Sequence, residues 1–240
     1  MRNSIIDTII SNWSKNNYLE PLLLICILYS LITLFYSTKK TELHKVFLLG
    51  LTLHAIGFLI IQTYPILFPY EPAINKKKTI LVINNFIIII EYFMFSYFFL
   101  KTLINQTIID VLRFTKWILV VLVLITQFFS LENYNNTTNT ASFILNSVEF
   151  ITILIASLRY FYETTQSSSN VNLIFLQPFL ISSAILIYIA SSLPYIACGS
   201  YLYKTNINVF KTLTIFHYLS LCILFVSISR AFLQNKKNHL

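Results

Sequence analysis

The sequence predicts an all-α polytopic membrane protein, folded as a bundle of seven transmembrane helices. Seven long apolar stretches begin near residues 19, 46, 79, 111, 143, 172 and 207. The chain is 56% hydrophobic and only 11% charged, whereas soluble domains carry about 25% charged residues. A spanning helix needs roughly 20 apolar residues. Seven such helices would therefore occupy most of this 240-residue chain.

Each apolar stretch is expected to form one helix, with short connections between neighbours. The predicted helices cover residues 19–37, 45–66, 79–102, 111–130, 142–163, 172–194 and 207–233. Pro65 is expected to end the second helix, and Pro178 to kink the sixth or mark its first turns. The segment 131–140, LENYNNTTNT, is predicted to be a loop.

Three regions are expected along the chain. Residues 1–18 place apolar side chains on one helical face, which predicts an amphipathic helix lying in the membrane interface. Residues 19–234 form the predicted seven-helix transmembrane domain, and residues 235–240 a basic cytoplasmic tail.

The distribution of Lys and Arg predicts the orientation. Ten of these residues lie on the side that holds the C-terminus and seven on the opposite side, with the run 76–78 opposing the trend. The positive-inside rule then favours an outside N-terminus and a cytoplasmic C-terminus. Heavy use of Ile, Phe, Asn, Lys and Tyr is typical of AT-rich coding sequence. It favours a bacterial protein of the inner, cytoplasmic membrane.

Composition and motifs argue against several functional classes. Three glycines in the whole chain leave no Gly-rich phosphate loop, and the three cysteines, Cys26, Cys198 and Cys222, lack metal-ligand spacing. The sequence also shows no pairing of a nucleophile with a general base, which would be the sign of an enzyme. We therefore expect no catalytic residue, cofactor or metal. The basic residues flank membrane segments, so the expected partner is the lipid bilayer and not nucleic acid.

Six polar residues inside the predicted spans are candidates for an intramembrane polar site. They are Glu91, Asn84, Glu149, Asn146, His54 and His217. Charged groups in hydrocarbon cost about 2.5–3.5 kcal/mol on insertion scales, so each needs a compensating role. With the predicted orientation all six lie between the outer leaflet and the midplane. They permit an amine-binding site, a proton-coupled switch or a network that only fixes helix packing.

Two further expectations concern helix packing and the membrane interface. Gly50 and Gly57 flank His54 on one helix face and would let a neighbouring helix approach closely. Gly199 is expected in a loop. The many tyrosines, Tyr195 among them, lie mostly near predicted helix ends, which is typical of an interfacial aromatic belt.

Two stretches, NNFIIIIEYFMFSYFF and FLQPFLISSAILIYIASSLPYI, resemble small seven-helix membrane proteins common in Bacteroidetes. The layout is also similar to the seven-helix input module found ahead of bacterial signalling domains. The resemblance implies a sensor role without assigning any residue. Because no kinase or cyclase follows the last helix, signalling would need a separate cytoplasmic partner or a homo-oligomer.

Two functions compete at this level. The first is a receptor- or sensor-like membrane subunit with an outer-leaflet polar pocket, signalling through a separate partner. The second is a small proton- or cation-coupled transporter or channel, in which Glu91 and Glu149 would line the path. The sequence shows no convincing three-helix repeat of the kind found in many transporters, which favours the receptor.

Overall fold

The computed structural model describes residues 19–37, 41–68, 70–132, 137–166 and 177–234. Every regular element within these ranges is an α-helix, which confirms the all-α class. The helices are α2 (Leu19–Phe35), α3 (Glu42–Leu67), α4 (Ala73–Thr102), α5 (Gln106–Glu132), α6 (Thr137–Gln166), α7 (Gln177–Thr205) and α8 (Ile207–Gln234). The predicted interfacial helix and basic tail lie outside the described residues.

Five of the described helices contain stretches long and apolar enough to cross a membrane. These stretches are Glu42–Pro65, Lys78–Thr102, Phe143–Gln166, Gln177–Gly199 and Ile207–Leu233. The 17 residues of α2 reach only about 25 Å at 1.5 Å per residue, against a hydrocarbon core of about 30 Å. In α5, three charged residues near the start, Asp110, Arg113 and Lys116, delay the apolar run. The chain is thus helical and built to span a membrane, and a count of seven spans stays a prediction.

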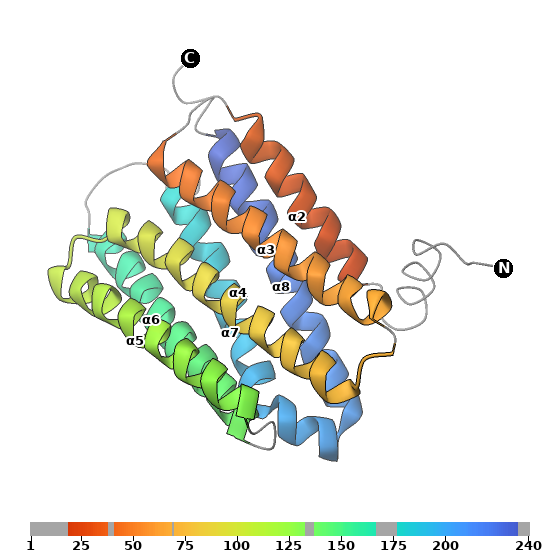
Figure 1. Cartoon of the computed structure of the whole chain (residues 1–240). Coiled ribbons are helices and arrows are strands. Elements are labelled where there is room, and N and C mark those ends of the chain that lie inside the picture. Colours follow the sequence, from red (N-terminus) through yellow and green to blue (C-terminus); the bar gives the residue numbers. More distant parts are fainter. Residues whose placement is uncertain (1–18, 38–40, 69, 133–136, 167–176, 235–240) are drawn as a thin grey trace.

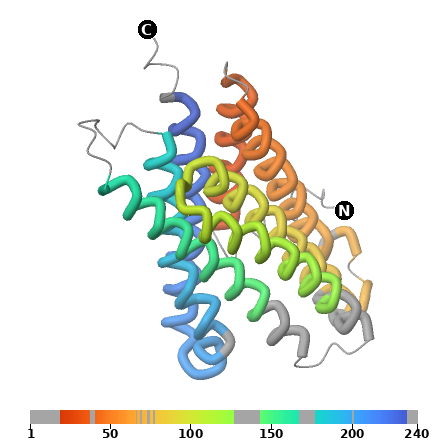
Figure 2. The backbone as a smooth tube through the Cα atoms, turned by 90° about the vertical axis from the view of Figure 1, so that its left-hand side faces the viewer, coloured from red at the N-terminus to blue at the C-terminus, as the bar shows by residue number. Residues whose placement is uncertain are grey.

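Six helices form a closed ring, and α5 lies outside it (Figures 1 and 2). Contacts run from α2 to α3, α4, α6, α7, α8 and back to α2. Helix α5 packs against α4 and α6 at the edge of the bundle. Successive helices run in opposite directions, so α2, α4, α6 and α8 all begin at one end (Figure 1). We call this the entry end and the other the closed end.

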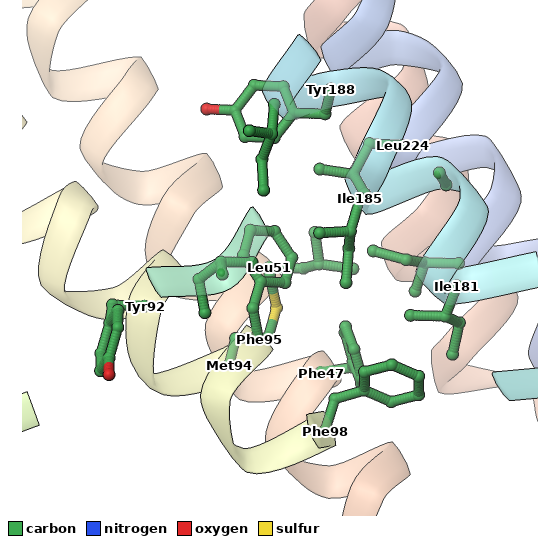
Figure 3. Close-up of a cluster of buried hydrophobic side chains, with 14 of the residues drawn as sticks. Phe47, Leu51, Tyr92, Met94, Phe95, Phe98, Ile181, Ile185, Tyr188 and Leu224 are labelled. Carbon is green, nitrogen blue, oxygen red and sulfur yellow. The ribbon is translucent and has the colours of Figure 1, made fainter. Parts of the chain in front are cut away.

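Aromatic and aliphatic side chains pack together in the half of the bundle toward the closed end, where Tyr92 alone of the labelled residues points outward to α5 (Figure 3). The labelled residues are Phe47, Leu51, Tyr92, Met94, Phe95, Phe98, Ile181, Ile185, Tyr188 and Leu224. They come from α3, α4, α7 and α8. All are buried, and Phe47 packs edge-on against Phe98 with ring centroids 6.2 Å apart. We refer to these ten residues as the packed core.

Specific hydrogen bonds tie helix ends together at the closed end. The Glu163 carboxylate at the end of α6 accepts the backbone N–H groups of Ile104 and Asn105, at 2.8 and 3.0 Å, in the α4–α5 connection. Arg159 holds the same carboxylate at 2.9 Å. On the other side of the ring, His44 Nε2 lies 2.7 Å from the Leu34 carbonyl oxygen near the end of α2. The closed end is thus fastened at two places, where α6 holds the α4–α5 connection and where α3 bonds the end of α2.

Several predicted boundaries were wrong in the same direction. Helix α7 continues through Pro194 to Thr205, because Tyr195 and Tyr203 both pack on Phe210 of α8 and this hairpin contact outweighs one lost backbone bond. Consequently Gly199 lies in a helix and not in a loop. Much of the predicted loop 131–140 is also helical, since α5 runs to residue 132 and α6 begins at 137.

The predicted close approach at the glycines of α3 is confirmed. A Cβ at Gly50 would lie 2.9 Å from Met94 Sδ, and a Cβ at Gly57 would lie 2.9 Å from Ile87 Cδ1. Both neighbours belong to α4. The absence of a side chain at these two positions therefore lets α3 and α4 pack closely, on either side of His54.

Candidate functional site

A cavity of about 340 Å³ occupies the ring toward the entry end. All six ring helices contribute to its wall, and α5 does not. Its polar lining consists of Glu91, His54, His217, Asn84, Asn146, Gln62 and three tyrosines. Ligand pockets in proteins commonly measure about 300–1,000 Å³. The cavity is therefore large enough for a small molecule.

Glu91 lies near the middle of α4 and is only 5% exposed. Its Oε1 is 3.0 Å from His54 Nδ1 on α3, and its Oε2 accepts a 3.2 Å hydrogen bond from the Tyr188 hydroxyl on α7. One carboxylate thus links three helices. The apolar residues on either side of Glu91 make this part of α4 helical and buried, and the turn-by-turn spacing points the carboxylate into the ring.

The contact between His54 and Glu91 is close, but it lacks the direction of a good hydrogen bond. Nδ1 of His54 satisfies the distance of an ion pair without a properly aligned acceptor. A protonated His54 and an ionised Glu91 would still attract each other at this distance, because charge attraction depends little on angle. The His54 ring also packs edge-on against Phe225 of α8, with centroids 5.2 Å apart.

His217 of α8 forms a second polar group beside the first. Its Nδ1 lies 2.8 Å from the Ser192 hydroxyl of α7. Its ring stacks on Tyr195, with centroids 4.9 Å apart and planes 12° from parallel, and lies 6.0 Å from the Tyr188 ring. Tyr188 therefore stands between Glu91 and His217 and contacts both.

The amides divide between two environments. Asn84 is exposed and lines the cavity on the entry-end side of Glu91, so it lies where the cavity opens. Asn146 of α6 lines the cavity as well. The adjacent Asn85 is buried and faces outward from the ring, with its Nδ2 3.4 Å from Thr126 Oγ1 of α5. The seven-residue spacing from Glu91 predicted that Asn84, and not the adjacent Asn85, shares the helix face of Glu91, and the structure agrees.

Glu149 is the one predicted site residue that does not line the cavity. It is 1% exposed on α6, and neither of its carboxyl oxygens has a hydrogen-bond partner among the described residues. It lies close enough to Glu91 for the two carboxylates to repel each other when both are ionised. An unpartnered buried carboxyl is costly. Its burial near Glu91 therefore needs a reason beyond packing.

Five further polar residues belong to the cavity region and were not predicted to be part of the site: Tyr188, Ser192, Tyr195, Gln62 and Tyr218. The first three follow a helical spacing of four and three residues along α7, which places them on one face. That periodicity could have identified these three residues from the sequence as one polar helix face. Tyr195 was instead grouped with the tyrosines near helix ends, but it lies inside α7 and stacks on His217.

Comparison with protein-family models, curated proteins and solved structures gave no match. The chemistry of the cavity therefore has to be argued from its own side chains. Across the described part of the chain, no three His, Cys, Asp or Glu side chains are grouped to hold a metal ion. The arrangement offers hydrogen-bond acceptors, aromatic faces and one carboxylate to a small ligand.

Proposed function

We propose that this protein is a receptor- or sensor-like integral membrane subunit that binds a small molecule in the cavity. The observation that carries the proposal is that the cavity occupies one end of the ring only. On the closed-end side of Glu91 and Tyr188, the interior of the ring, as far as the described residues show, is filled by the other inward-facing side chains of the packed core. A blind pocket suits binding, whereas a channel needs a continuous polar path.

The contacts around the cavity provide a route from a bound ligand to the closed end. The Tyr188 hydroxyl binds Glu91, while its ring lies 6.5 Å from Phe95 in the packed core (Figure 3). His54 packs on Phe225, whose carbonyl accepts a 2.8 Å hydrogen bond from Ser30 of α2. A ligand that moves Glu91 or His54 would therefore repack aromatic side chains that reach the closed end.

The proposed topology fits this direction of signalling. Seven spans with an outside N-terminus would place the entry end at the outer surface and the closed end in the cytoplasm, in a bacterial inner membrane. A cytoplasmic protein, or a second copy of the chain, would then receive the change at the closed end.

A small proton- or cation-coupled transporter is the second candidate, and Glu149 is the observation that favours it. A buried carboxyl without a partner, next to Glu91, suits a group that takes up and releases a proton. Transport would require the packed core to open during the cycle. The two functions therefore differ in whether a bound solute crosses the bilayer.

Ligand-dependent thermal unfolding of the purified chain tests the binding function. The chain is screened against a panel of small solutes that includes cations, anions and neutral molecules. A true ligand at 100 times its Kd should stabilise the fold by about 2.7 kcal/mol. Ile196→Trp, which fills the cavity, should abolish the effect. Ile187→Trp on the same helix, at an exposed position, is the matched control.

Proteoliposomes then separate the receptor from the transporter. The receptor predicts saturable binding with no accumulation of the solute inside vesicles, with or without a proton gradient. Gradient-dependent accumulation that is lost in Glu149→Gln would replace the receptor with the transporter. Failure of every solute to stabilise the chain would reject both.

A further inference from the structure

We infer that the cavity selects a small organic ammonium ion, which binds through Glu91 and the surrounding aromatic faces. This inference rests on the proposed binding function and narrows it to one chemical class.

The charge of the cavity wall is the first argument. Apart from tyrosines, the described residues that line the cavity include three ionisable side chains. They are the carboxyl group of Glu91 and the imidazoles of His54 and His217. No Lys or Arg is among the described residues that line it. Glu149 adds a second buried carboxyl near Glu91. When both histidines are neutral, an ionised Glu91 therefore makes the wall negative.

The coordination of Glu91 is the second argument. Each carboxylate oxygen can accept two hydrogen bonds. Oε1 is in contact with His54 only, and Oε2 accepts a bond from Tyr188 only, as far as the described residues show. Acceptor capacity thus remains on a carboxylate that faces an open cavity. An ammonium group supplies the N–H donors and the positive charge that this capacity suits.

The aromatic lining is the third argument. Tyr188, Tyr195, Tyr218, Phe58 and Phe150 contribute to the cavity wall. The negative face of an aromatic ring attracts a cation by about 0.5–2 kcal/mol, more when water is excluded. A bare inorganic cation would instead need a cage of oxygen ligands. A carboxylate ligand would gain nothing from the ring faces and would be repelled by Glu91.

The amides complete the recognition surface. Asn84 and Gln62 line the cavity from α4 and α3, and Asn146 lines it from α6. The carbonyl oxygens of Asn84 and Gln62 can accept N–H bonds, and their NH₂ groups can donate to a hydroxyl or carbonyl elsewhere on the ligand. The volume of about 340 Å³ limits that ligand to a small one.

Matched probes test the inference on the full chain in detergent. The panel consists of small primary, secondary and quaternary ammonium ions, each with the alcohol and the carboxylate of the same skeleton. The ammonium members should raise the melting temperature in a saturable manner, and the alcohols and carboxylates should not. Stabilisation by alcohols or carboxylates alone would overturn the cation assignment and leave the binding function standing. If no compound of any class stabilises the chain, both proposals fall.

Substitutions then locate the effect. Glu91→Gln should weaken the apparent affinity for ammonium probes by about tenfold or more. Asp110→Asn removes one exposed carboxylate near the closed end and should leave it unchanged. Undiminished affinity in a folded Glu91→Gln protein would overturn the assignment.

A pair of substitutions at the cavity mouth covers the case in which Glu91→Gln does not fold. Asn84 is exposed, so the fold should tolerate a charge there. Asn84→Lys should weaken ammonium binding and Asn84→Asp should strengthen it, each by a few-fold, and both effects should shrink at high salt. Equal affinity in the two variants, or the opposite order, would contradict the inference.

Discussion

The two halves of the ring are built from the same helices but are stabilised in different ways. Toward the closed end, aromatic side chains of the packed core interdigitate and Glu163 fastens the helix ends. Toward the entry end, the same helices separate around a cavity with a polar wall, held by the contacts of Glu91 and His217. The contrast suggests that stability resides mainly in one half and ligand response in the other.

The side of the membrane that each half faces gives the largest expected difference. Single cysteines at position 208, beside the entry end, and at position 104, where the native Ile104 is 84% exposed at the closed end, provide the comparison. In a chain without other cysteines, a membrane-impermeant thiol reagent on intact cells should label position 208 and spare 104. The reverse pattern would invert the proposed orientation and place the cavity mouth in the cytoplasm.

Truncation of a phenylalanine in each half compares their packing. Phe98 is fully buried in the packed core, whereas Phe58 borders the cavity. Phe98→Ala should lower the free energy of unfolding by about 2–4 kcal/mol because its neighbours cannot close the void. Phe58→Ala enlarges an existing cavity and should cost about half as much. Unfolding of both variants in mixed detergent measures the difference, and equal losses would contradict the division into two halves.

The glycine contacts give a smaller effect. Gly57→Leu should destabilise the chain by about 1–3 kcal/mol, because its Cβ already meets Ile87 at 2.9 Å. Gly199→Ala is the control: its Cβ would meet Phe210 at an ordinary 3.6 Å inside a helix, so the change should be neutral or stabilising by up to about 1 kcal/mol. Equal melting temperatures of the wild type and Gly57→Leu would reject close packing of α3 on α4.

The sequence was sufficient for the helices and for most of the polar wall. Long apolar runs predict helices whatever their neighbours, and the heptad spacing from Asn84 to Glu91 predicts a shared face. His54 and His217 were predicted to lie near Glu91 only because all three have a similar depth in the membrane when residues are counted from the helix ends. The structure then places five of the six predicted residues around one cavity. Whether they act together in function stays a prediction.

Other features depend on contacts between helices that a single sequence does not reveal. Helix α7 passes Pro194 because α8 holds its last turns through Phe210. Glu149 and Asn146 are three residues apart on α6, yet only Asn146 lines the cavity. A helix face spans a wide arc, and the position of the neighbouring helices decides which part of that arc borders the open space.

The smallest expected change in the free energy of unfolding comes from replacing each of the two buried carboxyl residues, Glu91 and Glu149. Glu91 has partners on two other helices, so Glu91→Met should leave the Tyr188 hydroxyl and His54 unpaired and destabilise the chain by about 1–2 kcal/mol. Glu149 has no hydrogen-bond partner among the described residues, so Glu149→Met removes a buried polar group and loses no bond. It should be neutral or stabilising by about 1 kcal/mol.

Thermal and denaturant unfolding of the two methionine variants, beside Glu91→Gln and Glu149→Gln, checks this difference. If Glu149→Met is stabilising yet impairs ligand response or solute coupling, Glu149 is retained at a cost to stability for a functional purpose. If Glu149→Met destabilises as strongly as Glu91→Met, the Glu149 carboxyl makes a stabilising interaction in the membrane, and its description as unpartnered would be wrong. The sign of that one change therefore decides whether the buried carboxyl of Glu149 serves packing or function.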